Sequence, residues 1–316
     1  MQDFFRRRLN VVFGDDAQVT DDEPFVLAGL DEYALMRDLI DSTQSALEVG
    51  PETDLAAVVT AQVARVHRAG RLPMAEPGRR TSQALVDGLV PMLSCWREQQ
   101  ASLPGRLPDQ PLRFAHGALV LEDWLGSLHA AGDGSGTPAV WLELVPGSLC
   151  DDPKRRTVRA DRLLVAWVRM LAASASGVAV SGVIVGRDAC VTVQPWPRAP
   201  ASAALADLLQ AWHEGLYGSA APLPLAPRTA LALVQGARDV AAVYEGSEYA
   251  RARPGEGEEA CLARLFPDYA ALRADGRFET LAGRLFGPLA AWVTDDVRLD
   301  LHGADEPDAA GGSAHD

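Results

Sequence analysis

Residues 139–193 read AVWLELVPGSLCDDPKRRTVRADRLLVAWVRMLAASASGVAVSGVIVGRDACVTV, and this stretch decides the fold. It contains two apolar runs of strand length, AVWLELV (residues 139–145) and VAVSGVIV (residues 178–185). Between them, residues 159–176 carry apolar side chains at helical spacing, and Gly177 ends that segment. A near-continuous apolar strand is typical of a sheet buried on both faces. Because a helix connects the two strands, we expect them to pair in parallel.

The residues before this stretch change from helical to strand-like periodicity near residue 108. Residues 71–80 are expected to form a loop, and the Gly, Asp, Ser and Pro residues of 131–138 a turn. We expect three helices, over residues 30–47, 53–69 and 81–99. Two strands should follow, over residues 112–114 and 118–129. The resulting order of helix, three meandering strands, helix and strand resembles the minimal core of restriction-endonuclease-like nucleases. The fold class expected is therefore α/β, with a mixed sheet and flanking helical regions.

The C-terminal part returns to helical periodicity and ends in an acidic segment that is too polar to bury. Helices are expected over residues 202–217, 228–244, 258–266 and 278–292. We therefore expect an N-terminal helical region (residues 1–105) followed by a nuclease-like α/β core (residues 106–220). A C-terminal helical region (residues 221–297) and a disordered acidic tail (residues 298–316) complete the chain.

Composition excludes several classes of protein. The 316 residues are 48% hydrophobic and 23% charged, with a net charge of −14, which argues against a protein that coats DNA. No apolar run is long enough for a transmembrane helix, and the N-terminus lacks the pattern of a secretory signal. The cysteines form no CxxC pair, so we expect free thiols in a reducing cytoplasm: Cys95, Cys150, Cys190 and Cys261.

The metal-binding motif of endonuclease-like cores lacks two of its positions here. Such cores hold Mg²⁺ with the pattern GxxD on the second strand and (D/E)xK on the third. If Asp123 takes the Gly position, Gly126 replaces the metal-binding Asp, while Glu143 keeps the acidic position and Val145 replaces the Lys. We expect no catalysis and no bound metal. The alternative is an active metal-dependent exonuclease that uses Glu122, Asp123 and Glu143 in a shifted register.

Two basic clusters are candidates for contact with DNA or with a partner protein. The first is Arg6, Arg7 and Arg8, for which the alternative is a helix face whose arginine stems cover apolar neighbours. The second gathers near the expected start of the connecting helix: Lys154, Arg155, Arg156, Arg159 and Arg162. Cations there oppose the helix dipole, which suggests a compensating anion such as a phosphate or an acidic surface. The alternative is a set of solvated loop charges paired with neighbouring aspartates.

Four strings of residues resemble one known family. They are FFRRRLNV (residues 4–11), EPFVLAGL (residues 23–30), LLVAWVRML (residues 163–171), and YEG, GEGEE and RLF within residues 244–266. In order and spacing, about residues 3–293 are similar to the C-terminal part of RecC. RecC is the gamma subunit of the bacterial RecBCD helicase–nuclease, exodeoxyribonuclease V.

The resemblance implies a non-catalytic structural or DNA-guiding domain with a defunct nuclease fold. It implies RecB-like and RecD-like partner subunits, a duplex DNA end or fork, and a role in double-strand break repair by recombination and in degradation of linear DNA. Mg²⁺ and ATP would be used by the partner subunits, with no cofactor bound by this chain. RecC proteins carry a longer N-terminal region, so the resemblance implies that Met1 begins a C-terminal fragment, a split gene product or a truncated form of such a protein.

Two further interpretations stay open at this stage. The turn at residues 131–138 is a candidate for the pin that splits the duplex in this family. Alternatively, the chain is an unrelated helical regulator that binds only protein, in which case residues 108–195 would contain no mixed sheet.

Overall fold

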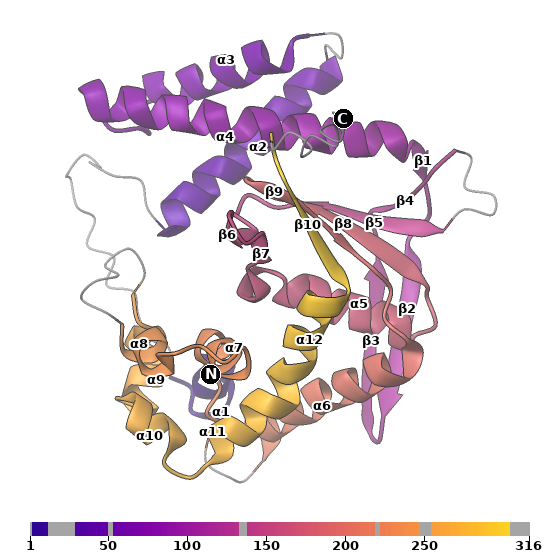
Figure 1. Ribbon diagram of the computed structural model, residues 1–316, viewed down its shortest axis with the longest axis vertical. Coiled ribbons are helices and arrows are strands. Elements are labelled where there is room, and N and C mark those ends of the chain that lie inside the picture. Colours follow the sequence, from indigo (N-terminus) through magenta and orange to yellow (C-terminus); the bar gives the residue numbers. More distant parts are fainter. Residues whose placement is uncertain are drawn as a thin grey trace, which may run out of the picture.

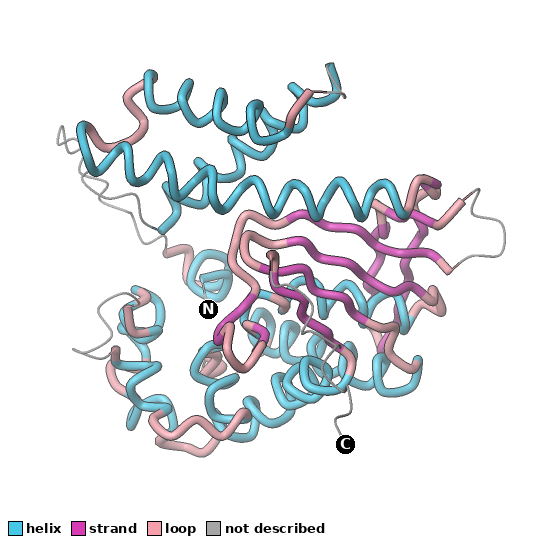
Figure 2. Tube along the Cα trace, turned by 45° about the horizontal axis from the view of Figure 1, so that its top comes forward, coloured by secondary structure: helices cyan, strands magenta, loops and turns pink. Residues whose placement is uncertain are grey.

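A computed structural model describes residues 2–11, 29–49, 53–132, 138–218, 222–246 and 254–303. Helices cover both faces of a mixed six-stranded sheet, with helix α4 (Ala75–Ser102) on one face and helix α5 (Leu164–Ala175) on the other (Figures 1 and 2). The chain is therefore a mixed α/β protein, as the sequence predicts, and a helical protein without a mixed sheet is excluded. In the described residues, no helix combines the length and the apolar character that crossing a membrane requires.

The main sheet has the strand order β1-β4-β5-β8-β9-β10. Strands β5 and β8 pair in parallel, with Ala139 opposite Val180 and Leu144 opposite Val185, and the other neighbours are antiparallel. The parallel pairing across the connecting helix is thus confirmed. The strands and that helix are β1 Gly105–Arg106, β4 Leu128–Ala130, β5 Ala139–Leu144, α5 Leu164–Ala175, β8 Val180–Val185, β9 Ala189–Val193 and β10 Val297–Leu301.

The N-terminal helices lie on the α4 side of the sheet: α2 Gly29–Val49, α3 Leu55–Arg68 and α4 Ala75–Ser102. The Asp54 carboxylate accepts hydrogen bonds from two backbone N–H groups at the start of α3, and Gly70 has the positive φ expected after its end. Helix α4 begins earlier than the sequence predicts, within residues 71–80. Pro77 lies in its first turn, where the missing N–H would have no helical partner.

One expected strand is divided into two. Residues 118–129 contain β3 Leu119–Leu125 and β4, separated at Gly126 and Ser127, and Ser127 has φ +55°. This left-handed residue turns the chain, so β3 leaves the main sheet and pairs with β2 Gln110–His116 as a separate ribbon. The interruption could not be predicted because a serine rarely adopts this conformation.

The C-terminal helices pack on the α5 side of the sheet, where Trp167 and Trp292 are fully buried. Residues 228–244, expected as one helix, form two because Gly236 takes a positive φ. The elements are α6 Arg198–Tyr217, α7 Pro227–Val234, α8 Val240–Glu245, η2 Glu256–Glu258, α9 Ala260–Leu265, α10 Tyr269–Arg273, α11 Arg277–Leu281, the π-helical turn η3 Ala282–Phe286 and α12 Gly287–Asp295.

The chain returns to the main sheet after α12. Strand β10 pairs with β9 from Val297 opposite Val193 to Leu301 opposite Ala189, and Leu299 is buried. Residues 298–301, expected within a disordered tail, therefore belong to the sheet. The alternation of Val297, Leu299 and Leu301 with charged residues is the strand signal, and the many acids around it concealed that signal. The rest of the expected tail, residues 304–316, lies outside the described residues.

Candidate functional site

Gly126 lies just before β4, and Glu143 lies on the neighbouring strand β5. In the β4–β5 pair, Leu128 lies opposite Trp141, and the backbone N–H of Leu142 donates to the Ser127 carbonyl at 3.0 Å. Gly126 lies beyond Ser127, whose positive φ turns the chain out of the main sheet toward β3, so the strand pairing does not extend to Gly126. The motif positions are close along the chain to the β4–β5 pair, and their role as a former metal site stays a prediction.

The acidic position is engaged by a cation of the protein itself. Glu143 Oε1 accepts a hydrogen bond from Arg169 Nη1 of helix α5 at 2.9 Å. The Arg169 guanidinium also lies over the Trp141 ring, with its carbon 5.3 Å from the ring centre. Because side chains alternate along a strand, Trp141 and Glu143 share the α5 face. The guanidinium therefore neutralises the carboxylate that a divalent cation would need.

The other two motif positions offer no ligand or amine. Gly126 has no side chain, and a Cβ built there would lie 3.1 Å from Asp109 Oδ1. Asp109, in the segment between β1 and β2, is an acid that sequence reasoning missed, because nothing in its spacing relates it to the motif. Val145 packs against the core on the α5 side, and its backbone N–H donates to the Val185 carbonyl at 2.9 Å.

Glu122 and Asp123 do not join Glu143. Both lie on β3 in the separate ribbon, where consecutive residues point to opposite faces. Glu122 is paired with Arg113 of the facing strand at 3.3 Å, and the Asp123 carboxylate accepts the backbone N–H of Trp124 at 2.8 Å. Throughout the ranges that the structure describes, no three His, Cys, Asp or Glu side chains gather as a metal site would require.

The first basic cluster lies on the short helix α1 Gln2–Arg8, which contacts α6. Phe5 is buried, whereas Arg6, Arg7 and Arg8 are exposed. The Arg8 guanidinium lies over the Phe4 ring at 5.2 Å, which agrees with the alternative of arginine stems that cover apolar neighbours. The cluster is an exposed positive surface.

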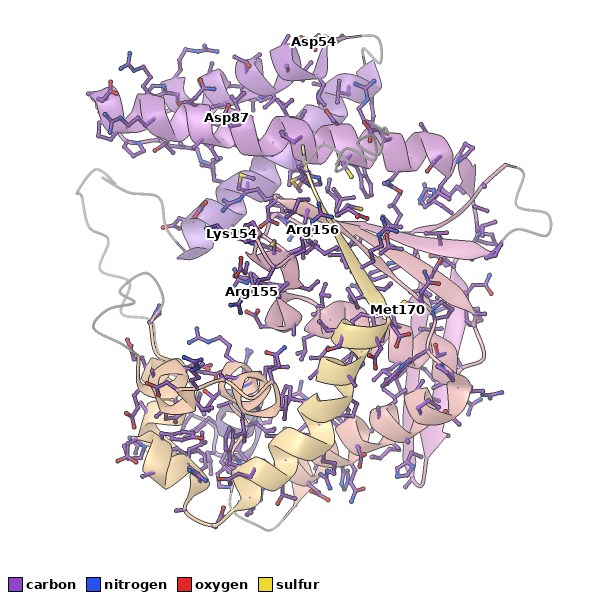
Figure 3. All side chains as sticks on the ribbon, viewed as in Figure 1. Asp54, Asp87, Lys154, Arg155, Arg156 and Met170 are labelled. Carbon is purple, nitrogen blue, oxygen red and sulfur yellow. The ribbon has the colours of Figure 1, made fainter. Side chains whose placement is uncertain are left out.

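The second basic cluster is not arranged as the sequence predicts. Lys154, Arg155 and Arg156 form the tip of a hairpin between β6 Cys150–Asp152 and β7 Thr157–Val158, and they precede the connecting helix without belonging to its first turn (Figure 3). The Asp152 carboxylate accepts the backbone N–H groups of Lys154 and Arg155, which fixes the turn. The expectation that these cations oppose a helix dipole is therefore incorrect for the hairpin. The Asp152 side chain could have indicated the turn, because Asp commonly caps one.

Arg159 and Arg162 lie beside the turn η1 Ala160–Arg162, immediately before α5, and both contact Asp161. The Arg159 side chain is only 18% exposed. It lines a cavity of about 390 Å³ together with Arg228, and a smaller one of about 130 Å³ together with Arg162 and Arg187. Sequence reasoning missed Arg187 and Arg228, which lie far from this cluster along the chain.

The fold and these contacts define a helix-flanked mixed α/β domain in which Glu143 of the main sheet is paired with Arg169. The family model for the RecC C-terminal domain matches residues 1–238, from α1 into the segment after α7. The chain belongs to the RecC C-terminal domain family. The strings at residues 244–266 that resemble RecC lie beyond the matched range. No significant match was found among curated proteins.

Proposed function

We propose that this chain is a non-catalytic structural and DNA-guiding domain of the RecC subunit in a RecBCD helicase–nuclease. Membership of the RecC C-terminal domain family supports a role in RecBCD-dependent DNA repair. In this proposal the partners are RecB-like and RecD-like subunits and a duplex DNA end or fork. Those subunits supply the Mg²⁺- and ATP-dependent chemistry of recombination and of linear DNA degradation, in the cytoplasm.

The main observation behind the non-catalytic role is that Arg169 pairs with Glu143, while Gly126 and Val145 offer neither a metal ligand nor an amine. Removing one group that stabilises a transition-state charge typically costs about 10²–10³ in rate, and losing a metal ligand costs the bound nucleophile as well. The order α4, antiparallel strands, β5, α5 and parallel β8 further supports an inherited nuclease-like core. On this interpretation the core contributes shape and binding surface.

The positive surfaces would contact phosphates or acidic partner surfaces. The best placed is the hairpin tip of Lys154, Arg155 and Arg156, whose side chains are exposed between the N-terminal and the C-terminal helices (Figure 3). Arg6, Arg7, Arg8, Arg159 and Arg162 would extend it. The proposed duplex-splitting turn at residues 131–138 falls largely outside the described residues, which omit 133–137.

Reconstitution with the partner subunits tests the proposal. A complex reconstituted with the wild-type chain and one reconstituted with the Glu143→Gln chain should degrade linear DNA equally well. The reason is that the partner subunits would carry out the cleavage. Arg79→Gln, at an exposed pair with Glu76, is a matched surface control. A tenfold or greater loss of nuclease activity with Glu143→Gln alone would favour the active exonuclease instead, as would DNA degradation by the isolated chain with Mg²⁺ or Mn²⁺.

A further inference from the structure

Two cysteines from distant parts of the sequence meet where helix α4 lies on the sheet. Cys190 is on β9, buried in the core on the α4 side, opposite Val185 of β8 and Asp300 of β10. Cys95, in α4, is partly exposed and packs against that same core. The two thiols are joined by a hydrogen bond. Cys95 is therefore the more exposed residue of the pair, and Cys190 is the buried one.

A histidine completes the group. His302 follows β10, and its side chain hydrogen-bonds to the Cys95 sulfur. Its Nε2 lies 2.8 Å from the Gly186 carbonyl, and its backbone N–H donates to the Asp188 carbonyl at 3.1 Å. Because the Gly186 carbonyl can only accept, Nε2 carries a proton, which leaves the opposite ring nitrogen for the thiol. The imidazole is thus held in place beside Cys95.

The charges around the group favour a thiolate on Cys95. The hydrogen bond from Cys190 lowers the pKa of Cys95 most, and the hydrogen bond and charge of His302 lower it further, against burial and the negative charge of Glu98. The same hydrogen bond raises the pKa of Cys190, together with burial and Asp300. Burial lowers the pKa of His302, but the contacts with Cys95 and Gly186 and the charge of Asp188 outweigh it and leave that pKa raised.

We propose that Cys95 and Cys190 are an oxidation-sensitive dithiol, in which Cys95 reacts with hydrogen peroxide and Cys190 then closes a disulfide between α4 and β9. The Cys95 thiolate attacks one peroxide oxygen, so that an S–O bond forms and the O–O bond breaks. The sulfur is oxidised to a sulfenic acid, and the leaving hydroxide takes a proton to become water. The Cys190 sulfur then attacks the Cys95 sulfur, an S–S bond replaces the S–O bond, and the second hydroxide leaves as water with the Cys190 proton.

The remaining cysteines provide internal controls. Cys150 and Cys261 are buried, and burial raises the pKa of each thiol, with nearby carboxylates adding to the effect. Thiolates are the reactive species, so these two cysteines should resist oxidation under conditions that convert Cys95.

Peroxide treatment of the 316-residue chain, followed by alkylation, tryptic digestion and mass spectrometry, tests the proposal. Trypsin separates Cys95 (residues 81–97) from Cys190 (residues 188–198). The expected product is one intramolecular cross-link of these two peptides, two hydrogen atoms lighter than their sum, with Cys150 and Cys261 alkylated. Alkylation of all four cysteines at equal rates, or cross-links between chains, would overturn the proposal.

Three variants separate the chemistry from a folding effect. Cys190→Ser should trap the sulfenic acid on Cys95, detectable with a dimedone probe, whereas Cys95→Ser should leave Cys190 reduced. His302→Asn should slow oxidation roughly tenfold at pH 6 and leave it unchanged at pH 10, because a free thiol is ionised there in any case. Cys261→Ser is the matched control, and circular dichroism verifies that each variant is folded. An unchanged pH profile in His302→Asn would remove the assigned role of the histidine.

Discussion

The side chain of Tyr244 is held by burial and by a hydrogen bond within the chain. It is fully buried, and its hydroxyl donates to the Phe266 carbonyl at 2.6 Å. Gly257 lies so close to the ring that a Cβ there would be 2.7 Å from a ring carbon. Burial raises the pKa of Tyr244 to about 12, and the negative charges of nearby carboxylates, Glu256 first, contribute.

Tyr244→Phe should lower the free energy of unfolding by about 1–3 kcal/mol, because the Phe266 carbonyl loses its donor. The folded pKa near 12 exceeds the unfolded value of about 10. The stability that Tyr244 contributes is therefore complete below about pH 10 and is lost as the pH rises through about 12. Urea denaturation between pH 8 and pH 12 should show the wild type losing its advantage over Tyr244→Phe. A constant difference across that range would contradict this account.

Not every residue-level feature could be predicted from the sequence. The spacing of a known motif selected Glu143 and Gly126 as candidates, and their role stays a prediction. Arg169 and Asp109 approach them only in the folded protein, so no pattern in the sequence identifies them. The contact of Cys95 with Cys190 also could not be predicted from the sequence, because it depends on where α4 lies on the sheet.

At the scale of elements, apolar runs predicted the central sheet and failed at its edges. Strands β5 and β8 are fixed by near-continuous apolar residues, and their parallel pairing follows from the helix between them. Strand β3 leaves the sheet at a left-handed serine, and β10 is embedded in an acidic sequence, so both departures needed the three-dimensional structure. The ends of the sheet are set by contacts distant in the sequence.

Strand β10 should be necessary for stability although the sequence around it is polar. Ending the chain after residue 296 removes the partner of β9 and exposes the surface that Leu299 covers. Burial of one such side chain contributes about 1.5–3 kcal/mol. Thermal unfolding should show a lower midpoint for residues 1–296 than for residues 1–303. Equal midpoints would show that β10 adds nothing to the sheet.

Across the whole molecule, the net charge of −14 contrasts with a local positive hairpin. Neutralising Lys154, Arg155 and Arg156 to alanine should weaken the binding of DNA by the reconstituted complex by about tenfold at low salt. The difference in affinity between wild type and variant should shrink as the salt concentration rises. The variant neutralises fewer phosphates and releases fewer counterions, so its affinity depends less steeply on salt. Arg79→Ala with Arg80→Ala, at the exposed pairs with Glu76, is the matched control. Equal salt slopes for the hairpin variant and wild type would exclude phosphate contact at the hairpin.

The proposed non-catalytic role requires that Glu143 bind no divalent metal ion. Titration of Mn²⁺, followed by electron paramagnetic resonance, tests this requirement when wild type and Glu143→Gln are compared at neutral pH. We predict superimposable titrations, because Arg169 occupies the Glu143 carboxylate and Gly126 supplies no ligand. A Mn²⁺ site present in the wild type and absent in Glu143→Gln would contradict the account.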